Sequence, residues 1–429
     1  MTRLLRSSAP RRSGHRLLVR GIAVAGVALA RGLSAQPAAT VTAFTGATLI
    51  DGTGRAPVRN ATLVVREGKV VAAGAGERIA VPAGASRVPL NGKVIIPGLI
   101  NAHGHASTAA NLATYAAYGV TTVYSLGDEG PEVFAAREAQ RRASPAHARV
   151  YLAGPVLAPA TPDEARAQVS AAVARGVDII KIRVDDNLGT ATKMTPEVYR
   201  AVITEAHARG QRVAVHVYYL EDARALLAAG ADYIAHSVRD HLVDAGFVNA
   251  LKRSGVCYSP TLMREVSTFV YDTVPAFFAD SQFRAHADRA WMATVTDPAR
   301  MAATRRSASA QRYKAQLPVA IQNLATLAAA GVPIAMGTDT GPVGRFQGYF
   351  ELMEMEMMVD AGLSPAAVLT SATRDAARCL RIDQEVGTLE AGKQADFVVL
   401  HASPLEDMRN IRRQHSVWIG GARVNTSPR

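Results

Sequence analysis

Two histidines separated by one glycine, His103 and His105, are the first residues of this sequence whose types and spacing suit metal chemistry. They follow the apolar run Val-Ile-Ile-Pro-Gly-Leu-Ile-Asn-Ala at 94–102. Side chains two residues apart on a strand point to the same side, and two adjacent imidazoles bind zinc or a similar ion. The spacing by itself also arises by chance as a polar pair, so the interpretation needs support from other residues.

Lys181 is the second candidate, because it lies inside the apolar run Val-Asp-Ile-Ile-Lys-Ile-Arg-Val at 177–184. The chain has only seven lysines against 41 arginines. A buried ammonium is costly unless it is paired or neutralised. One interpretation is a salt bridge to Asp185 or Asp186. The other is that Lys181 reacts with carbon dioxide to form a carbamate, whose two oxygens can bridge two metal ions.

Three further residues end apolar runs: His216 in Val-Ala-Val-His, His236 in Tyr-Ile-Ala-His and Asp339 in Met-Gly-Thr-Asp. A single histidine in such a place is more often a hydrogen-bonded polar residue than a ligand, and an aspartate before Thr-Gly is often a turn residue. Two histidines in consecutive units, after the His-x-His pair and the strand lysine, favour a shared metal site. A carboxylate at Asp339 could bind one ion and carry a proton.

The middle of the chain contains the elements that must position these residues. Strand-like runs are predicted at 94–101, 120–126, 149–153, 178–184, 212–217, 233–235, 256–258 and 333–336, with alanine-rich helical stretches between them. Several helical stretches end in a glycine, the residue preferred after a helix C-terminus, at Gly119, Gly176, Gly210 and Gly331. Eight strands alternating with helices predict a (β/α)8 TIM barrel, an α/β fold whose strand carboxyl ends form the catalytic face.

Short alternating β-like runs fill residues 41–97 and return at 396–400 and 416–424. They predict one small β-sandwich domain formed from both chain ends, at 36–96 and 383–429, with the barrel inserted at 97–382. Residues 262–330 are too many for one loop and helix, so extra helices are expected beside the active-site face.

Residues 1–35 are interpreted as an export signal, because a basic stretch precedes the apolar run 21–30 and small residues follow it. We therefore expect a periplasmic or secreted protein. These residues carry seven arginines and no acid, so the formal charge of +12 falls to +5 without them. Without a basic stripe interleaved with aromatic residues elsewhere, nucleic-acid binding is not expected.

The remaining composition, with 48% hydrophobic and 20% charged residues, is typical of a globular protein. No stretch after the first 35 residues is apolar enough for a transmembrane span. The two cysteines, Cys257 and Cys379, are expected to be buried free thiols, although one bridge is an alternative.

The order His-x-His, Lys, His, His, Asp on strands one, four, five, six and eight resembles the amidohydrolase superfamily. The resemblance is to its binuclear subtype with a carboxylated lysine, in the imidazolonepropionase-related group. That group includes prolidases and amidases that cleave N-acyl amino acids such as ochratoxin. The resemblance covers nearly the whole chain after the first 35 residues, including 94–105 and the run Val-Gly-Thr-Leu-Glu-Ala-Gly-Lys-Gln-Ala-Asp-Phe-Val-Val-Leu at 386–400.

The resemblance implies two divalent ions, with zinc as the default and manganese or cobalt as alternatives. It assigns His103, His105 and Asp339 to one ion and His216 and His236 to the other, with carboxylated Lys181 and a hydroxide between them. Asp339 would act as general acid and base. Mononuclear deaminases of the superfamily lack the strand lysine and carry His-x-x-Glu on strand five. Here His216 is followed by Val-Tyr-Tyr.

The predicted reaction is cleavage of an amide or peptide C–N bond in an Xaa-Pro-like dipeptide or an N-acyl amino acid. Tyr218 and Arg239 are the candidates for binding a substrate carboxylate. The alternatives are an aromatic wall for Tyr218 and a surface ion pair with Asp240 for Arg239. A lactonase, esterase or cyclic amidase with the same site remains an alternative function. A non-catalytic scaffold is a further alternative function. The presence of a suitable residue at all six ligand positions argues against it. A homo-oligomer is left open.

Overall fold

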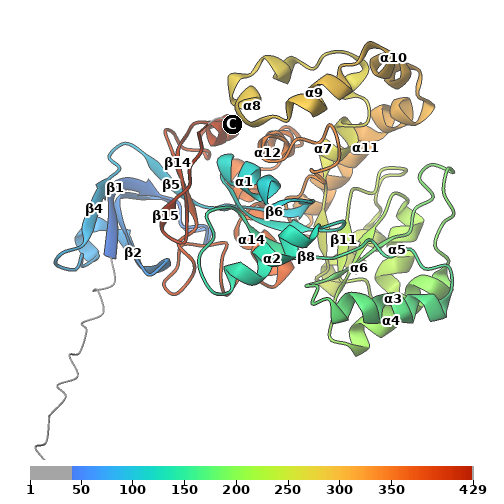
Figure 1. Ribbon diagram of the computed structural model, residues 1–429, viewed down its shortest axis with the longest axis horizontal. Helices are drawn as coiled ribbons and strands as arrows, with labels where there is room; N and C mark the ends of the chain where they lie inside the picture. The colour runs from blue at the N-terminus through green and yellow to red at the C-terminus, as the bar shows by residue number, and fades with distance from the viewer. Residues whose placement is uncertain (1–40, 428–429) are drawn as a thin grey trace, which may run out of the picture. The chain divides into compact units, whose positions relative to one another are not determined.

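Strands from both ends of the chain form one small β domain (Figure 1). In the computed structural model, which describes residues 41–427, the strand order is β15-β14-β13-β5-β1-β2-β3, with β4 paired to β1. The hairpin between β2 and β3 turns at Glu67-Gly68, both with positive φ, as a two-residue turn matched to twisted strands requires. The strands are β1 (Val41–Leu49), β2 (Val58–Arg66), β3 (Lys69–Ala75), β4 (Ser86–Pro89), β5 (Val94–Pro97), β13 (Phe397–Leu400), β14 (Gln414–Ile419) and β15 (Ala422–Arg423).

Aromatic side chains from the two chain ends pack together in the core of this small domain. The ring centroid of Phe44 lies 4.9 Å from that of Phe397 and 4.8 Å from that of Trp418, in edge-to-face arrangements. Such pairs stabilise a core beyond the area they bury. The prediction that both ends build one β domain is therefore confirmed.

Parallel strands close into the barrel in two sheets joined by isolated bridges. The first sheet has the order β6-β7-β8 and the second β9-β10-β11-β12, and Leu157 bridges to Ile182 between them. The prediction of a TIM barrel with a small β domain is confirmed. The strands are β6 (Leu99–Gly104), β7 (Val120–Ser125), β8 (Arg149–Leu152), β9 (Ile180–Arg183), β10 (Val213–His216), β11 (Tyr233–Ala235) and β12 (Cys257–Ser259).

Two strand predictions need correction. The run 94–101 is not one strand, because Pro97-Gly98 divides it: β5 belongs to the small domain and β6 starts the barrel. The run 333–336 forms no continuous ladder. The segment from Ile334 to Thr340 closes the barrel through single bridges, Tyr258 to Ile334 on one side and Gly104 to Thr340 on the other. Proline at 333 has no N–H to donate, which shortens the ladder at that end.

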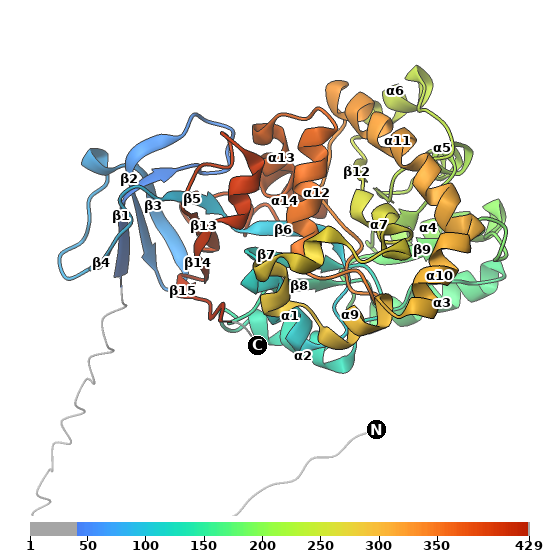
Figure 2. The ribbon, with the colours of Figure 1, turned by 90° about the horizontal axis from the view of Figure 1, so that it is seen from above.

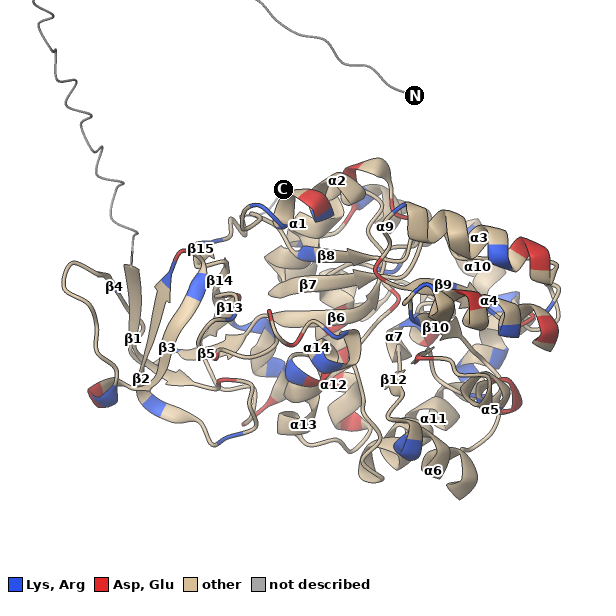
Figure 3. Ribbon diagram, turned by 90° about the horizontal axis from the view of Figure 1, so that it is seen from below, with Lys and Arg blue, Asp and Glu red and all other residues tan. Residues whose placement is uncertain are grey.

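Helices cover the outside of the barrel, and charged residues are spread over them while the strands are mainly uncharged (Figure 3). The predicted glycines after helix C-termini all have positive φ, between 71° and 80°. The helices of the repeating units are α1 (Ala109–Ala117), α2 (Pro131–Gln140), α3 (Pro162–Ala174), α4 (Pro196–Ala208), α5 (Leu220–Ala228), α6 (Ala245–Ser254), α12 (Tyr349–Asp360), α13 (Pro365–Ser371) and α14 (Arg374–Leu380).

The expected extra helices are present between β12 and the last barrel segment. They include the long helix α11, which lies beside the short helix α7 (Figure 2). No helix of residues 41–427 is long and apolar enough to cross a membrane. The extra helices are α7 (Leu262–Val266), α8 (Ser281–His286), α9 (Arg289–Val295), α10 (Pro298–Arg306) and α11 (Ala308–Ala329).

The expectation of two free thiols is wrong, because Cys257 and Cys379 form a disulfide. Cys257 opens β12 and Cys379 lies near the end of α14, 122 residues later. The barrel places their Cα atoms 5.8 Å apart, within the range that a disulfide spans. The residues predicted as an export signal, 1–35, lie outside the described part of the chain.

Candidate metal centre

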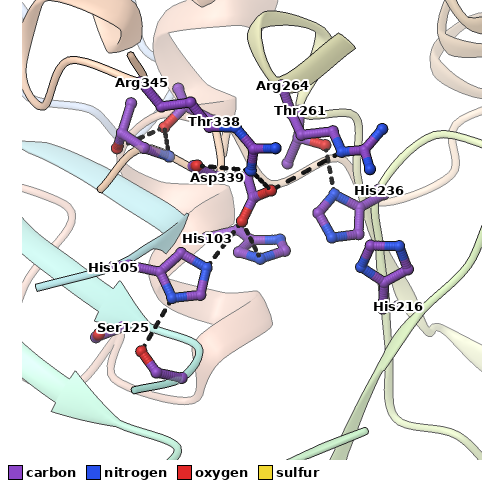
Figure 4. A network of polar contacts seen from close by, with 12 residues as sticks. His103, His105, Ser125, His216, His236, Thr261, Arg264, Thr338, Asp339 and Arg345 are labelled. Atoms are coloured by element: carbon purple, nitrogen blue, oxygen red, sulfur yellow. Dashed lines mark hydrogen bonds and ion pairs between the residues drawn. The ribbon is translucent and has the colours of Figure 1, made fainter. Parts of the chain in front are cut away.

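The carboxyl ends of the barrel strands bring the predicted ligands together (Figure 4). His216 is the last residue of β10, His236 directly follows β11, and His105 directly follows β6. The ring centroid of His103 lies 4.4 Å from that of His236, which lies 4.0 Å from that of His216. The ring centroid of His105 lies 5.7 Å from that of His103, so the four histidines form one continuous group of rings.

Asp339 completes this group from the last barrel segment. Its Oδ1 lies 2.8 Å from Nε2 of His105 and 3.3 Å from Nε2 of His103. Ligand atoms of these three residues all lie within 4.8 Å of one another, so they could hold a metal ion. Asp339 has φ 60° and His236 φ 86°, a left-handed conformation that is uncommon for residues other than glycine and is typical of functional sites.

Lys181 lies on β9 with a side chain that is 2% exposed. Its Nζ has no hydrogen-bond partner among the described residues. The alternative salt bridges do not form: Asp185 binds His216 and Arg183, and Asp186 accepts from the Tyr219 hydroxyl. Burial lowers the pKa of Lys181 to about 7. A buried amine without a partner, neutral in part of the population near pH 7, has the properties needed to react with carbon dioxide.

Hydrogen bonds to residues outside the group of ligands orient three of the histidine rings. Nδ1 of His105 lies 2.9 Å from the Gly127 carbonyl oxygen, which can only accept a hydrogen bond. Nε2 of His216 lies 2.7 Å from Oδ2 of Asp185. Nδ1 of His236 lies 2.8 Å from the Thr261 hydroxyl. In each of these rings one nitrogen has a polar partner, which is how metal-binding histidines are commonly held.

The electrostatics keep most of these imidazoles neutral. Burial lowers the pKa of His103 and of His236 well below its usual value, and lowers that of His216 to about 3. For His105 the bond to Asp339 outweighs burial and raises the pKa. Burial alone would raise the pKa of Asp339, but Arg345 and the histidines hold it well below its usual value. Neutral imidazoles and an ionised carboxylate are the forms that bind metal.

A buried network behind the site was not predicted from the sequence. Oε1 of Glu351, on α12, accepts hydrogen bonds from Asn101 and from the hydroxyls of Thr338 and Thr340. Asn101 in turn accepts from the backbone N–H of His103. The network ties the strand carrying His103 to the segment carrying Asp339. In the sequence, the Thr-Asp-Thr triplet at 338–340 was the only feature that could have indicated this network. Glu351 lies in a helix that carries no motif.

The two predicted substrate-binding residues are not aimed at the metal ligands. The Tyr218 hydroxyl contacts Gln316 of α11. Arg239 is fully buried, donates to the carbonyls of Val217 and Ser237, and pairs with Glu265 at 3.0 Å. The alternative of a surface ion pair between Arg239 and Asp240 is therefore wrong. Their role in substrate binding stays a prediction.

Two other arginines, which the sequence analysis did not identify, lie beside Asp339. Arg345 pairs with Oδ2 of Asp339, and Nε of Arg264 lies 4.0 Å from the same oxygen. Arg264 belongs to α7, which follows β12, and Arg345 to the loop that follows Asp339. Both loops start at the carboxyl end of the barrel, where substrate must approach.

The chain is similar in sequence to a known family and to two known enzymes. Residues 94–424 match the model of the amidohydrolase family. Ochratoxinase of Aspergillus niger is 25% identical over 281 residues, which are 63% of this chain and 51% of that protein. The chain thus spans about half the length of that relative. Imidazolonepropionase of Aromatoleum aromaticum is 47% identical over 74 residues, 17% of this chain and 18% of that protein.

A solved structure supports the fold along most of the chain. A Bifidobacterium longum protein provisionally described as a prolidase superposes with a TM-score of 0.75 and 28% identity. The superposition covers 92% of this chain and 97% of that one.

Proposed function

The chain belongs to the amidohydrolase family, as its sequence motifs predicted, and from this premise we propose that it is a hydrolase that cleaves an amide or peptide C–N bond. The observation that carries the proposal is the convergence of His103, His105 and Asp339 into one group of ligand atoms beside two further buried histidines. No serine or cysteine nucleophile is needed, because water attacks the carbonyl.

The residues fit a pair of divalent ions. His103, His105 and Asp339 would hold one ion and His216 and His236 the other, and the neutral state of His103, His216 and His236 suits ligation. Bound divalent ions lower the pKa of water, so that hydroxide exists near neutral pH, and they polarise a carbonyl.

We propose that Lys181 carries a carbamate between the two sets of ligands. The Nζ nitrogen of the neutral amine bonds to the carbon of CO2 and releases one proton, which gives an anion with two oxygens; starting from the ammonium, two protons are released in all. The absence of any described hydrogen-bond partner for Nζ and its lowered pKa support this assignment.

Asp339 is the proposed proton carrier. Its carboxylate accepts the proton of the attacking water and passes it to the leaving nitrogen, so that amide and water give a carboxylic acid and an amine. His105 and Arg345 hold the carboxylate in place through Oδ1 and Oδ2 respectively. The substrates we favour are Xaa-Pro-like dipeptides and N-acyl amino acids, which the names of the ochratoxinase and prolidase-like relatives support.

The test is a hydrolysis screen of Xaa-Pro dipeptides, N-acyl amino acids and lactones with protein prepared in zinc and bicarbonate. We expect release of amine from one of the first two groups and about two metal ions per chain by elemental analysis. Cleavage confined to lactones would overturn the amide proposal. A Lys181→Ala variant should lose most metal and activity, and full activity in that variant would overturn the carbamate.

We also propose that the protein is exported. The arginine-rich segment and apolar run within residues 1–35 support this, as does the disulfide, because disulfides persist mainly in oxidising compartments. Fractionation of the producing cell tests it. Recovery of the full-length chain from the cytoplasm alone would contradict export.

A further inference from the structure

A cavity of about 660 Å³ lies at the end of the barrel opposite the metal ligands. Arg149 is the first residue of β8, Asp178 precedes β9 and Arg212 precedes β10, so the amino ends of three strands border the cavity. Arg381, which directly follows α14, borders it from another side, and Lys69 borders it from β3 of the small β domain. The cavity therefore lies between the barrel and the small domain and is separate from the proposed catalytic face.

Six cationic side chains line this cavity: Lys69, Arg137, Arg141, Arg149, Arg212 and Arg381. Close ion pairs neutralise two of the arginines. Nε of Arg149 lies 2.6 Å from Oδ2 of Asp396, and Nε of Arg137 lies 3.3 Å from Oδ2 of Asp178. These two pairs are complete without a ligand, so they account for part of the positive charge but not for all of it.

Glu138 and Glu385 are two further acids beside the cavity. Oε1 of Glu138 lies 3.5 Å from Nη1 of Arg141, and Oε2 of Glu385 accepts a hydrogen bond of 3.3 Å from the Tyr151 hydroxyl. Counted over the lining residues and their ion-pair partners, four carboxylates face six cations. An excess of two positive charges remains. Charges of one sign in a recess reinforce one another's field, which attracts an anion.

Arg212 and Arg381 are the two arginines of this cavity that pair with no carboxylate of residues 41–427. Arg212 is oriented by the end of α14, because its Nη1 donates to the Cys379 carbonyl at 2.7 Å and its Nη2 to the Leu380 carbonyl at 2.9 Å. Backbone carbonyls fix a guanidinium without neutralising its charge. Arg381 comes directly after Leu380 and has φ 59°, a conformation in which glycine is preferred at a helix end. A guanidinium that is ordered before the ligand arrives loses little conformational entropy on binding.

We propose that this cavity binds the phosphate group of a phosphate monoester or of inorganic phosphate, with Arg212, Arg381 and Lys69 as its cationic partners. A monoester carries a charge of about −1.5 to −2 at pH 7, which matches the excess of two positive charges. Guanidinium groups bind phosphate oxygens through paired, parallel hydrogen bonds. The volume lies within the range of about 300–1,000 Å³ that small-molecule sites occupy, so the organic part of a small monoester also fits. The bound phosphate contacts the barrel and the small domain at once, and it takes no part in the proposed hydrolysis.

The test is calorimetric titration of the full metal-loaded chain with glycerol 3-phosphate and with inorganic phosphate. We expect saturable binding to the wild type with a Kd below about 1 mM. Arg212→Gln should weaken binding by about 10- to 100-fold, the range for a charge-assisted hydrogen bond. Arg381→Gln should weaken it by about 5-fold, because its side chain is more exposed to solvent. Succinate, whose two charges sit on separate groups, should bind at least about 10-fold more weakly than glycerol 3-phosphate.

The matched control is Arg378→Gln. Arg378 lies on the same helix as Leu380, is exposed like Arg381, and does not line this cavity. This variant should bind glycerol 3-phosphate as the wild type does. Phosphate also binds metal ions, so His103→Ala, which disrupts the proposed metal centre, separates the two sites: it should keep the binding that Arg381→Gln weakens. Thermal unfolding checks that each variant folds, and Arg381→Gln decides the test if Arg212→Gln does not fold.

Such a phosphate has two sources, a soluble monoester or the headgroup of a lipid. Sedimentation with phosphatidylcholine vesicles, with and without phosphatidic acid, distinguishes them. Retention by phosphatidic acid that Arg381→Gln lowers assigns the site to a lipid, and binding of glycerol 3-phosphate without such retention assigns it to a soluble molecule. Three results overturn the proposal: no saturable binding of either form, folded Arg212 and Arg381 variants that bind as the wild type does, or equal affinity for succinate.

Discussion

Replacing Asp185 by asparagine should weaken one half of the metal centre and leave the other half unchanged. Asp185 is buried, and its Oδ2 accepts a hydrogen bond of 2.7 Å from Nε2 of His216. Its other oxygen accepts from Nε of Arg183 at 2.8 Å. The carboxylate thus holds the His216 proton on Nε2 and leaves Nδ1 for the metal. Asparagine has nearly the same shape but no charge.

The magnitude follows from the type of hydrogen bond that is lost. A bond to a charged group contributes about 1.5–3 kcal/mol and a neutral one about half as much. The substitution should therefore cost about 0.75–1.5 kcal/mol, or roughly a 4- to 13-fold loss of affinity for one ion. The ligands His103, His105 and Asp339 make no described hydrogen bond to Asp185, so the affinity for the other ion should stay the same.

The assay is chelator competition with protein loaded with Zn²⁺ or Co²⁺, which distinguishes a weakly bound ion from a strongly bound one. Asp186→Asn is the matched control, because Asp186 is the next residue and accepts from the Tyr219 hydroxyl instead of a histidine. It should bind both ions as the wild type does. Unchanged affinity in the Asp185 variant, or an equal loss of both ions, would refute the proposed role of Asp185.

Three further predictions concern the stability of the protein. Because burial raises the pKa of Glu351 from 4.5 in the unfolded chain to about 7, the folded state loses stability as pH rises from about 4.5 to 7, up to an order of 3 kcal/mol. Denaturant unfolding across this range should show a smaller loss in Glu351→Gln, which keeps the three hydrogen bonds to Oε1, than in the wild type, because the raised pKa of buried Glu354 contributes a loss to both proteins; parallel curves would contradict it. Reduction of the disulfide should lower the free energy of unfolding by about 2–5 kcal/mol, measured by denaturant titration with and without reductant, and a Cys257→Ala variant should be insensitive to reductant. Removal of divalent ions by a chelator should abolish hydrolysis and lower the Tm, and zinc should restore both; activity that persists after complete metal removal would contradict the proposed chemistry.

The metal ligands could be predicted because strand geometry places them. A residue at the end of each apolar run must face the same end of a parallel barrel, so His216, His236 and Asp339 meet although they are far apart in sequence. The glycines after helices were predictable for a local reason as well, since only glycine takes positive φ without cost.

The contacts behind the ligands depend on side chains from unrelated elements, and no local pattern marks them. Glu351 lies in a helix among methionines, and Arg264 is one of many arginines in the chain. The disulfide had the same origin: Cys257 and Cys379 show no spacing motif, and only the closed barrel brings them together. Pro97-Gly98 was visible in the sequence, but the change of sheet at that point depends on pairing with a strand from the other chain end.

The pairing of β5 with β13 has a consequence for the chain while it is being synthesised. In the small β domain β5 lies between β1 and β13, and the backbone N–H of Gly98 donates to the Asp396 carbonyl at the entrance to the barrel. During synthesis β1 to β5 leave the ribosome first, whereas β13 follows almost three hundred residues later. Until then β5 is an unpaired sheet edge, which is prone to aggregation. Nascent chains that stop before residue 397 should therefore bind chaperones through this edge, and completion of the last strands ends that exposure.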